Sequence, residues 1–474
     1  MGDNAQFNWQ QPLWPKAKVN RAALGEELKA FAKAFRTLKK ALKKPQDMEV
    51  VARALTDEAV KTSAIEGVNV DESVVMSSIC KALGVAYAPK GFTKDKRAEG
   101  VAQMMLAVRE KWNAPLSAKL LTGFHGALMK GEENRVTVGA FRSHKKPMRV
   151  IRRLNDGTIE IRYVAPPSAD VPKEIATFVK MWKTPAEKPS EIALKCAMLH
   201  PHFESIHPFE DGNGRVGRAL VAKTIAEGLG APLILPISTI IARHRAAYYD
   251  EINEASRSLD WTNWCAFFIP VLTEMLISFV AAMRFIKAKR EYLAKYENGF
   301  SERARKVILR MFEDGEEGAR AGLSAAKWMR MAKVSKPTAV DDLSKLEESG
   351  AIIRTGLLTR LEYHLSVFTN EGINEGINGS DELTNGALNG TIKRVDDFTD
   401  EPVNEPQNDT INNRLNSCIL KLVKSHPGVK LPYLHSVVSV SRATVERAVA
   451  ALIKAGKIEY RGSKKTGGYW RIEN

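Results

Sequence analysis

The chain has few cysteines, and the four that it has are not spaced as pairs. Cys80, Cys196, Cys265 and Cys418 are scattered through apolar segments of a 474-residue sequence. Disulfide frameworks and zinc sites use paired spacings, so this pattern favours reduced thiols in a protein core. We therefore expect a bacterial-type cytosolic protein with a cytoplasmic location.

A leader, long apolar runs and an excess of acidic residues are lacking as well. Residues 1–20 are polar and carry two tryptophans, unlike a signal peptide. No apolar run approaches the roughly 20 residues that cross a bilayer, so no membrane partner is expected. The 71 Lys and Arg outnumber the 55 Asp and Glu, which gives a net charge of +16. That balance favours an acidic partner, for which nucleic acid is the usual candidate.

The most informative stretch is residues 207–218, His-Pro-Phe-Glu-Asp-Gly-Asn-Gly-Arg-Val-Gly-Arg. Apolar residues at helical spacing follow it as far as Gly228, so a helix is predicted to begin at about Gly214. The first amides of that helix and its dipole would form an anion site. Gly212 and Gly214 let the backbone approach such an anion closely. Phosphate is the natural ligand.

Four polar side chains of the stretch could contribute to binding or reacting such a phosphate. Arg215 and Arg218 lie three residues apart at the helix start, so both can hold one polyphosphate. Asp211 can bind Mg²⁺, which takes oxygen ligands from one or two carboxylates and from phosphates. His207 has an ordinary pKa suited to removing a proton from a hydroxyl. With Phe209 anchoring the loop, these parts indicate phosphoryl-type transfer.

The stretch also resembles a known signature, His-Pro-Phe-x-Asp/Glu-Gly-Asn-Gly-Arg-x-x-Arg, the motif of Fic-domain enzymes, and every specified position is present. The resemblance implies transfer of AMP from ATP to a hydroxyl side chain of a protein. It implies that His207 is the base and that Asp211 binds the Mg²⁺ cofactor. The ATP-binding residues that it implies are Gly212, Asn213, Gly214, Arg215 and Arg218. Related phosphotransferases carry Lys where this chain has Gly214, which favours AMP transfer over phosphate transfer.

A second motif, residues 62–67 with the sequence Thr-Ser-Ala-Ile-Glu-Gly, precedes the signature. It resembles the inhibitory motif of Fic proteins, to which Thr62, Glu66 and Gly67 would belong. The resemblance implies that the glutamate pairs with Arg218 and blocks the place of the γ-phosphate. A carboxylate there would also cancel the charge that the nucleotide needs. The alternative is a solvated carboxylate at a helix end.

The rest of the enzyme region is predicted from its periodicity and from the same resemblance. We expect an aromatic arm over residues 1–20, N-terminal helices over 21–110 and a Fic catalytic domain over 111–290. The arm resembles a leader that lies on the domain in many Fic proteins, and a disordered tail is the alternative. Helical spacing is found at 21–41, 48–60, twice between 98 and 130, and at 174–182, 191–200, 243–255 and 261–280.

A β-hairpin is predicted over residues 145–165. β-rich runs at 148–153 and 158–164 surround Asn155-Asp156-Gly157, a strong turn signal. The resemblance implies that this hairpin, the flap, aligns a target segment by adding it as a strand. Its basic residues would favour acidic surroundings; they are Lys145, Lys146, Arg149, Arg152 and Arg153.

Two further groups of residues have alternative interpretations. Tyr248 and Tyr249 lie where Fic proteins have aromatic residues beside the adenine, so either one of them stacks on the base or both pack in the core. His200, His202 and His207 raise the possibility of a metal cluster. Their spacing does not match a helix-based zinc pair, and no fourth ligand is obvious.

From about residue 300 the sequence repeats itself, since Ser335 matches Ser441 and Gly350 matches Gly456. Each copy predicts helices, a tight turn, a further helix and then strands, which is a winged helix-turn-helix pattern. We place these modules at 300–368 and 414–474. Residues 369–413, rich in Asn, Asp, Glu and Gly, are expected to be a flexible acidic tether.

The second module is the better candidate for DNA binding. Arg442 and Arg447 lie on its predicted recognition helix, and residues 461–465 form a basic wing suited to phosphates. The first module carries acidic residues that would face a negatively charged backbone, so it could serve in protein contacts or packing instead. These residues are Asp341, Asp342, Glu347 and Glu348.

The sequence thus predicts a mainly α protein, with a Fic-type helical bundle, a flap and two winged-helix modules. The predicted activity is a protein adenylyltransferase that is inhibited by Glu66, modifies a Ser, Thr or Tyr hydroxyl, and can modify itself. Assembly into a homo-oligomer is a further expectation. One alternative is removal of AMP at the same site, with Glu66 positioning water. Another is a DNA-binding regulator that senses nucleotide, although such a sensor would not require the base His207.

Overall fold

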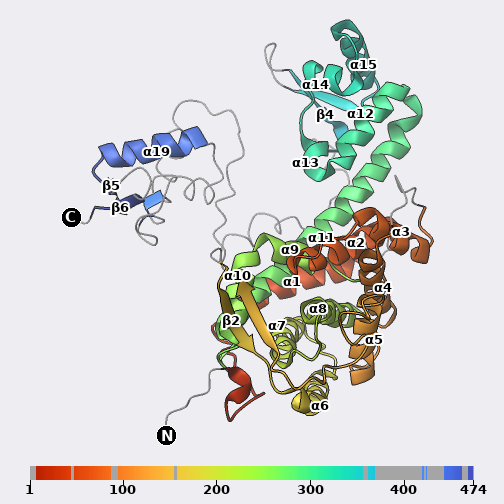
Figure 1. Cartoon of the computed structure of the whole chain (residues 1–474). Helices are drawn as coiled ribbons and strands as arrows, with labels where there is room; N and C mark the ends of the chain where they lie inside the picture. Colours follow the sequence, from red (N-terminus) through yellow and green to blue (C-terminus); the bar gives the residue numbers. More distant parts are fainter. Residues whose placement is uncertain are drawn as a thin grey trace. The chain divides into compact units, whose positions relative to one another are not determined.

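The computed structural model describes residues 7–43, 47–86, 94–153, 157–355, 361–368, 419–420, 423, 442–461 and 468–472. Within these ranges the protein is mainly helical, as predicted, with three two-stranded antiparallel hairpins (Figure 1). Residues 1–381 and 382–474 form two separate units.

The first unit begins with a helical bundle built around one continuous apolar core that includes residues from Leu24 to Ile286. Nearly all of α8 is buried in it, beside α7. In chain order the helices are α1 (Gly25–Ala41), α2 (Met48–Ile65), α3 (Glu72–Leu83), α4 (Lys96–Glu110), α5 (Ala118–Leu128), α6 (Val171–Trp182), α7 (Pro189–Ile206), α8 (Asn213–Leu229), α9 (Ile237–Arg243), α10 (Arg245–Ala255) and α11 (Thr262–Tyr296), with short 3₁₀ turns at η1 (Asn8–Gln10), η2 (Ser168–Asp170) and η3 (Glu297–Gly299).

The predicted helices are present, but three boundaries differ from the prediction. The helix predicted over 243–255 is α10, which begins two residues later than predicted because α9 ends at Arg243, and α11 continues well past residue 280. α7 also continues past His200, through Pro201, to Ile206. A proline has no amide hydrogen, so it leaves the carbonyl of Ala197 without its helical donor. The indole Nε1 of Trp264 donates to that carbonyl at 2.6 Å, which explains how the helix tolerates the proline.

The N-terminal arm lies on the bundle, as predicted for residues from Phe7 onward. Phe7 is 2% exposed and its ring meets that of Tyr163 at 5.0 Å. Asn8 is fully buried and its Nδ2 donates to the hydroxyl of Ser205 at 2.8 Å. The indole of Trp9 donates to the carbonyl of Val164 at 2.8 Å. These contacts rule out a disordered tail for the described part of the arm.

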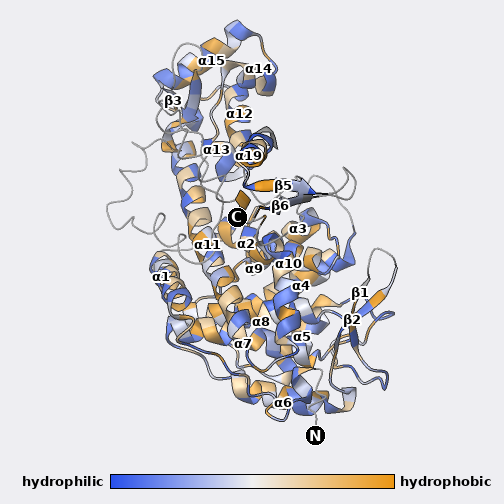
Figure 2. Cartoon of the chain, turned by 90° about the vertical axis from the view of Figure 1, so that its left-hand side faces the viewer, coloured by the Kyte–Doolittle hydropathy of each residue, from blue (hydrophilic) through white to orange (hydrophobic). Residues whose placement is uncertain are grey.

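α11 is long and apolar enough to cross a membrane by length and composition alone, so the expectation that no segment approaches that length is wrong. Half of its most apolar stretch is buried inside the protein. Trp264, Phe268 and Leu272 belong to the core of the bundle, and Figure 2 shows apolar colouring along the helix. The core helix of a soluble protein passes the same test.

The predicted hairpin is confirmed. β1 (Arg149–Arg153) pairs antiparallel with β2 (Ile159–Val164), with a bulge between Val150 and Ile151. Among the described strands, the two pair only with each other, so each retains an open edge. Several of their apolar side chains are exposed, namely Val150, Ile151, Ile159 and Ile161.

The first C-terminal module has its own core around Trp328. It consists of α12 (Glu302–Glu313), α13 (Gly315–Arg320), α14 (Ala325–Ala332), α15 (Lys336–Glu348), the hairpin β3 (Ile352–Thr355) and β4 (Glu362–Leu365), and η4 (Ser366–Phe368). The expectation that Asp342 faces outward is wrong. It is 5% exposed, and it accepts hydrogen bonds from the indole of Trp328 and from Arg303. This carboxylate stabilises the module core.

The second unit contains α19 (Arg442–Lys454), β5 (Ile458–Arg461) and β6 (Gly468–Arg471). Arg447 is exposed on α19, as predicted. Arg461 hydrogen-bonds to Glu459 and lies over the ring of Trp470, so part of the predicted basic wing is neutralised. The tether 369–413 and residues 462–465 of the wing lie outside the described residues.

The prediction of reduced cysteines in the core is confirmed for the three cysteines that the structure describes. Cys80, Cys196 and Cys265 are free and buried. Cys418 lies outside the described residues.

Candidate active site

The signature loop lies between two residues with left-handed backbones. His207 ends α7 with φ 49° and ψ 56°, and Gly212 precedes α8 with φ 83°. α8 begins at Asn213, one residue before the predicted start. Its first amides therefore face the loop without helical partners, as an anion site requires.

Asn213 holds the loop in shape. Its side-chain oxygen accepts from the amide of Phe209 at 2.8 Å, and its Nδ2 donates to the carbonyl of Phe209 at 2.9 Å. Phe209 is fully buried, as predicted, and stacks on His125 with ring centroids 4.0 Å apart. Because its side chain is occupied, Asn213 can meet a nucleotide only through its backbone amide.

His125 is a loop-supporting residue that the sequence analysis missed. Its Nδ1 accepts from the amide of Gly139 at 3.0 Å, which leaves Nε2 to donate to the carbonyl of Asp211 at 3.2 Å. Burial lowers the pKa of His125 to about 4, so the ring is neutral at pH 7. Only its three-dimensional contacts, and no motif, identify it.

Arg142 is a second loop-supporting residue that the sequence analysis missed. Its side chain donates to the carbonyls of His207 at 2.7 Å and Pro166 at 2.6 Å, and to the hydroxyl of Ser168 at 2.9 Å. Arg142 is 2% exposed. Its hydrogen bond to the His207 carbonyl stabilises the left-handed backbone conformation at His207.

His207 reaches a cavity of about 990 Å³ enclosed by the signature loop, α10 and the hairpin. Burial and the nearby Arg142 guanidinium lower the pKa of His207 to about 4. The imidazole is therefore neutral at pH 7 and able to accept a proton. The same cavity is lined by Glu66, Asp211, Gly212, Asn213, Gly214, Arg218, Tyr248 and Tyr249, so most of the predicted site residues converge there.

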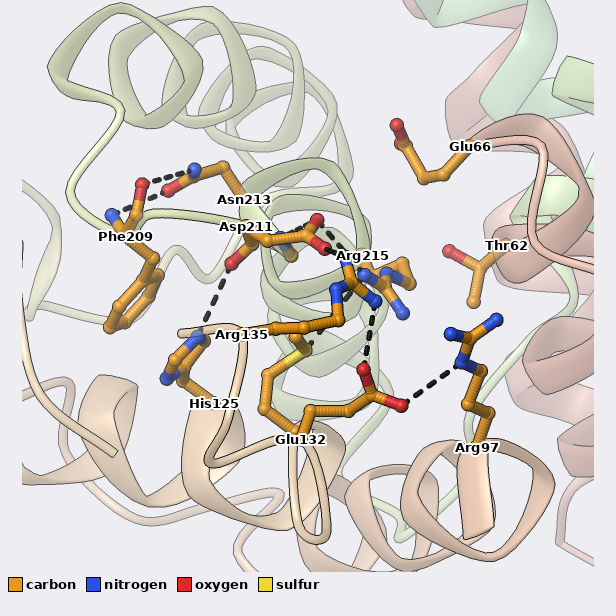
Figure 3. Close-up of polar contacts among 12 residues, drawn as sticks. Thr62, Glu66, Arg97, His125, Glu132, Arg135, Phe209, Asp211, Asn213 and Arg215 are labelled. Atoms are coloured by element: carbon orange, nitrogen blue, oxygen red, sulfur yellow. Dashed lines mark hydrogen bonds and ion pairs between the residues drawn. The ribbon is translucent and has the colours of Figure 1, made fainter. Parts of the chain in front are cut away.

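Asp211 lies at the centre of a chain of ion pairs (Figure 3). Its Oδ1 accepts from Arg215 at 3.1 Å and its Oδ2 from Arg135 at 3.0 Å. Arg135 also forms an ion pair with Glu132, and Glu132 forms a second ion pair with Arg97. Arg215 is buried and absent from the cavity lining, whereas Arg135 is half exposed.

The predicted partner of Glu66 is present. The Oε1 of Glu66, the residue that ends α2, accepts from the Nη2 of Arg218 at 2.7 Å. Arg218 also donates to the hydroxyl of Thr62 at 2.8 Å and to its carbonyl at 2.9 Å. Burial acts to lower the pKa of Arg218, but the Glu66 carboxylate outweighs it, so that pKa is raised. Gly67 has φ 74°, which lets the chain turn away after the glutamate.

Gly214 explains how the Glu66 carboxylate reaches the start of α8. A Cβ atom at this position would lie 2.2 Å from Glu66 Oε1 and 3.0 Å from Arg218 Nη1. Any other side chain would displace the ion pair. The carboxylate thus occupies the space over the first turn of α8, where an anion is expected.

The two tyrosines have different surroundings. Tyr248 is 3% exposed and hydrogen-bonds to His200 Nε2 at 2.7 Å, so it packs in the core. Tyr249 is 40% exposed, and its ring is the one that a base could stack on. Its hydroxyl donates to the carbonyl of Ile65 at 3.0 Å.

His200 and His202 are buried, and each has surroundings of its own. Burial lowers the pKa of both His200 and His202 to about 3. The indole of Trp182 donates to His202 Nδ1 at 2.9 Å. Among the described residues no group of three or more His, Cys, Asp or Glu could hold a metal ion.

Comparisons with known proteins agree with this geometry. Residues 115–224 match the family model of the Fic/DOC family, and residues 7–85 match a domain of unknown function, DUF4172. The chain is 34% identical over 94 residues, 20% of its length, to a probable protein adenylyltransferase of Aquifex aeolicus. It is 48% identical over 54 residues, 11% of its length, to a Fido domain-containing protein of Dictyostelium discoideum.

Each curated similarity covers a minor part of the relative. The matched segments span 27% of the Aquifex protein and 36% of the Dictyostelium protein. A solved Fic family protein from Desulfovibrio desulfuricans G20 aligns with 74% of this chain and 98% of its own, at 20% identity and a TM-score of 0.45. The family match contains the whole signature loop. Residues 115–224 are therefore similar in sequence to the Fic/DOC family.

Proposed function

We propose that this protein transfers AMP from ATP to a Ser, Thr or Tyr hydroxyl of a protein. The observation that carries the proposal is the convergence of a neutral histidine, an anion site and a buried arginine in one cavity of a Fic/DOC domain. The similarity to a probable protein adenylyltransferase supports the same activity.

In this reaction the acceptor oxygen attacks the α-phosphorus, and the bond from that phosphorus to the pyrophosphate oxygen breaks. His207 takes the proton of the hydroxyl, and pyrophosphate leaves with the bonding electron pair. The low pKa of His207 makes it a weak base in the free enzyme. The negative charge of bound phosphates would raise that pKa toward the working range.

The oxygens of Asp211 fit a magnesium ion, because Mg²⁺ is usually held by one or two carboxylates together with substrate phosphates. When bound, the ion neutralises developing phosphate charge. Arg135, which is half exposed, would have to give up its contact with Asp211. Arg215 would keep the carboxylate oriented from the buried side.

We propose further that Glu66 inhibits the transfer. Its carboxylate shares the anion position with the phosphates and binds the arginine that would hold them. Two negative groups cannot occupy this space, so ATP would bind productively only after Glu66 leaves.

The hairpin is the proposed docking site for the target segment. The open edges of β1 and β2 and their exposed apolar side chains support strand addition. The protein itself is one candidate target. Assembly into oligomers, DNA binding by residues 414–474 and a cytoplasmic location remain proposals.

The test compares wild type, Glu66→Gly and His207→Ala, each incubated with Mg²⁺ and ATP labelled on the α- or the γ-phosphate. We expect retained α-label and one added AMP by intact mass on Glu66→Gly, little on wild type and none on His207→Ala. Retention of γ-label alone would mean phosphate transfer. If no variant retains either label, alone or in host lysate, the transferase proposal is wrong, and removal of AMP from a modified protein becomes the reaction to assay.

A further inference from the structure

The C-terminal end of α2, which carries Glu66, is held by the catalytic domain on both sides. The last four carbonyls of an α-helix have no helical donors. In α2 these belong to residues 62–65. The turn formed by residues 66–68 satisfies the two middle carbonyls with its own amides. The two outer carbonyls depend on side chains from elsewhere in the chain.

The donor to the first of these, Thr62, is Arg218, a signature residue. The donors to the last, Ile65, come from α10. Arg245 Nη2 donates to the Ile65 carbonyl at 2.8 Å, and the Tyr249 hydroxyl donates to the same oxygen at 3.0 Å. The Arg245 guanidinium also lies over the Tyr249 ring, 5.7 Å from its centroid.

This arrangement suits a helix C-terminus. The partial negative charge of the dipole is concentrated there, and a guanidinium stabilises it. Ile65 directly precedes Glu66, so fixing the Ile65 carbonyl fixes the backbone from which the Glu66 side chain reaches Arg218. Both donors bond to the carbonyl of the residue before Glu66, so they act on Glu66 through the adjoining peptide.

We propose that Arg245 and Tyr249 form a latch that holds the inhibitory turn in place, and that they are positioning residues for Glu66. The proposal rests on the inhibition proposed above. Both side chains also line the cavity. A ligand that moved the Tyr249 ring would therefore loosen the turn, which couples occupancy of the cavity to release of Glu66.

The two donors share one acceptor, which makes their effects non-additive. Removing either one leaves the Ile65 carbonyl satisfied by the other, so opening of the turn should increase only about twofold. Removing both leaves a helix-end carbonyl without a protein partner. The double variant should open the turn roughly tenfold more often than wild type.

Hydrogen exchange of the full-length protein tests the latch without requiring catalysis. The variants are Arg245→Met, Tyr249→Phe, which retains the ring, and the pair combined. The amides of residues 66–68 report opening, because all three bond within the turn. The matched control is Arg243→Met, since Arg243 pairs with Glu274 instead.

We expect faster exchange at residues 66–68 in the double variant, with unchanged exchange in the core of α8. Exchange should be unaltered in Arg243→Met, and Arg245→Lys combined with Tyr249→Phe should restore part of the protection. Exchange in the double variant equal to wild type would overturn the latch. So would loss of protection throughout the bundle, because that would indicate a general structural role.

The labelled-ATP assay separates this proposal from the proposed function. If Glu66→Gly acquires AMP and the double variant acquires it about tenfold faster than wild type, both proposals are supported. If Glu66→Gly acquires AMP while the double variant exchanges and reacts as wild type does, only the latch is wrong. If exchange rises but no variant acquires AMP, the latch stands and the transferase function is wrong.

Discussion

Replacing Glu66 with glutamine tests whether charge, and not merely bulk, is responsible for the proposed inhibition. Glutamine has nearly the same shape and retains an oxygen for Arg218, but it carries no charge. Arg218 Nη2 and Glu66 Oε1 are 2.7 Å apart. The Arg218 side chain is only 1% exposed, whereas that of Glu66 is 30% exposed. A hydrogen bond to a charged group contributes about 1.5–3 kcal/mol, and a neutral one about 0.5–1.5 kcal/mol.

The difference between these values, about 1–1.5 kcal/mol, corresponds to roughly a tenfold shift toward the open site. We therefore expect AMP transfer by Glu66→Gln to be about tenfold faster than by wild type and slower than by Glu66→Gly. The assay is the initial rate of α-label incorporation at saturating Mg²⁺ and ATP. Glu26→Gln, which removes an exposed partner of Lys29, is the matched control and should react as wild type does.

Two results would refute this reasoning. A Glu66→Gln rate equal to wild type would mean that the side chain blocks by its volume. A rate equal to that of Glu66→Gly would mean that the neutral contact contributes nothing.

Three further predictions concern other parts of the molecule. Burial raises the pKa of Glu58 from 4.5 to about 7, so its contribution to stability is present below pH 4.5 and is lost as the pH rises through 7. Glu58→Gln should remove on the order of 3 kcal/mol of the pH dependence of the free energy of unfolding, measured by denaturant titration between pH 5 and 8, and an unchanged slope would contradict this. Arg142→Met should lower the free energy of unfolding by about 3 kcal/mol or more, because it leaves buried carbonyls without donors, and a melting temperature equal to wild type would contradict it. Arg447→Ala in the full chain should weaken duplex DNA binding at all sequences and reduce the slope of log affinity against log salt by about 1; equal slopes would remove this residue from a DNA interface.

The sequence predicted the site well where its parts are adjacent in the chain. Residues 207–218 carry His207, Asp211 and both arginines within one short stretch, and local rules place a helix there. The pairing of Glu66 with Arg218 was predicted only through the resemblance to Fic proteins. Spacing alone cannot show that two residues far apart in the chain meet.

The residues that support the signature loop could not be predicted, because each contacts a residue that is far away in the sequence. His125 contacts the carbonyl of Asp211, and Arg142 holds His207. No pattern in the sequence marks either contact. The contact of Arg245 with Ile65 could not be predicted either, because its acceptor is a main-chain carbonyl, a group that every residue carries.

The predictions that differ from the structure concern residues whose tertiary contacts allow an unusual position, such as a buried carboxylate or a proline inside a helix. Asp342 was expected to face a negatively charged nucleic-acid backbone, yet it is buried and pairs with Arg303 in the module core. The helix predicted over 191–200 continues through Pro201 to Ile206, because Trp264 replaces the missing hydrogen bond. Tertiary contacts outweigh local preference in both cases.

The packing of the N-terminal arm sets an order of events during synthesis. The arm leaves the ribosome well before its partners: Asn8 bonds to the carbonyl of Ala255, and the amide of Lys18 donates to the carbonyl of Leu259. Contacts so distant along the chain form only after most of the enzyme region has emerged. The arm can therefore complete these contacts only after residues 255–259 have been synthesised.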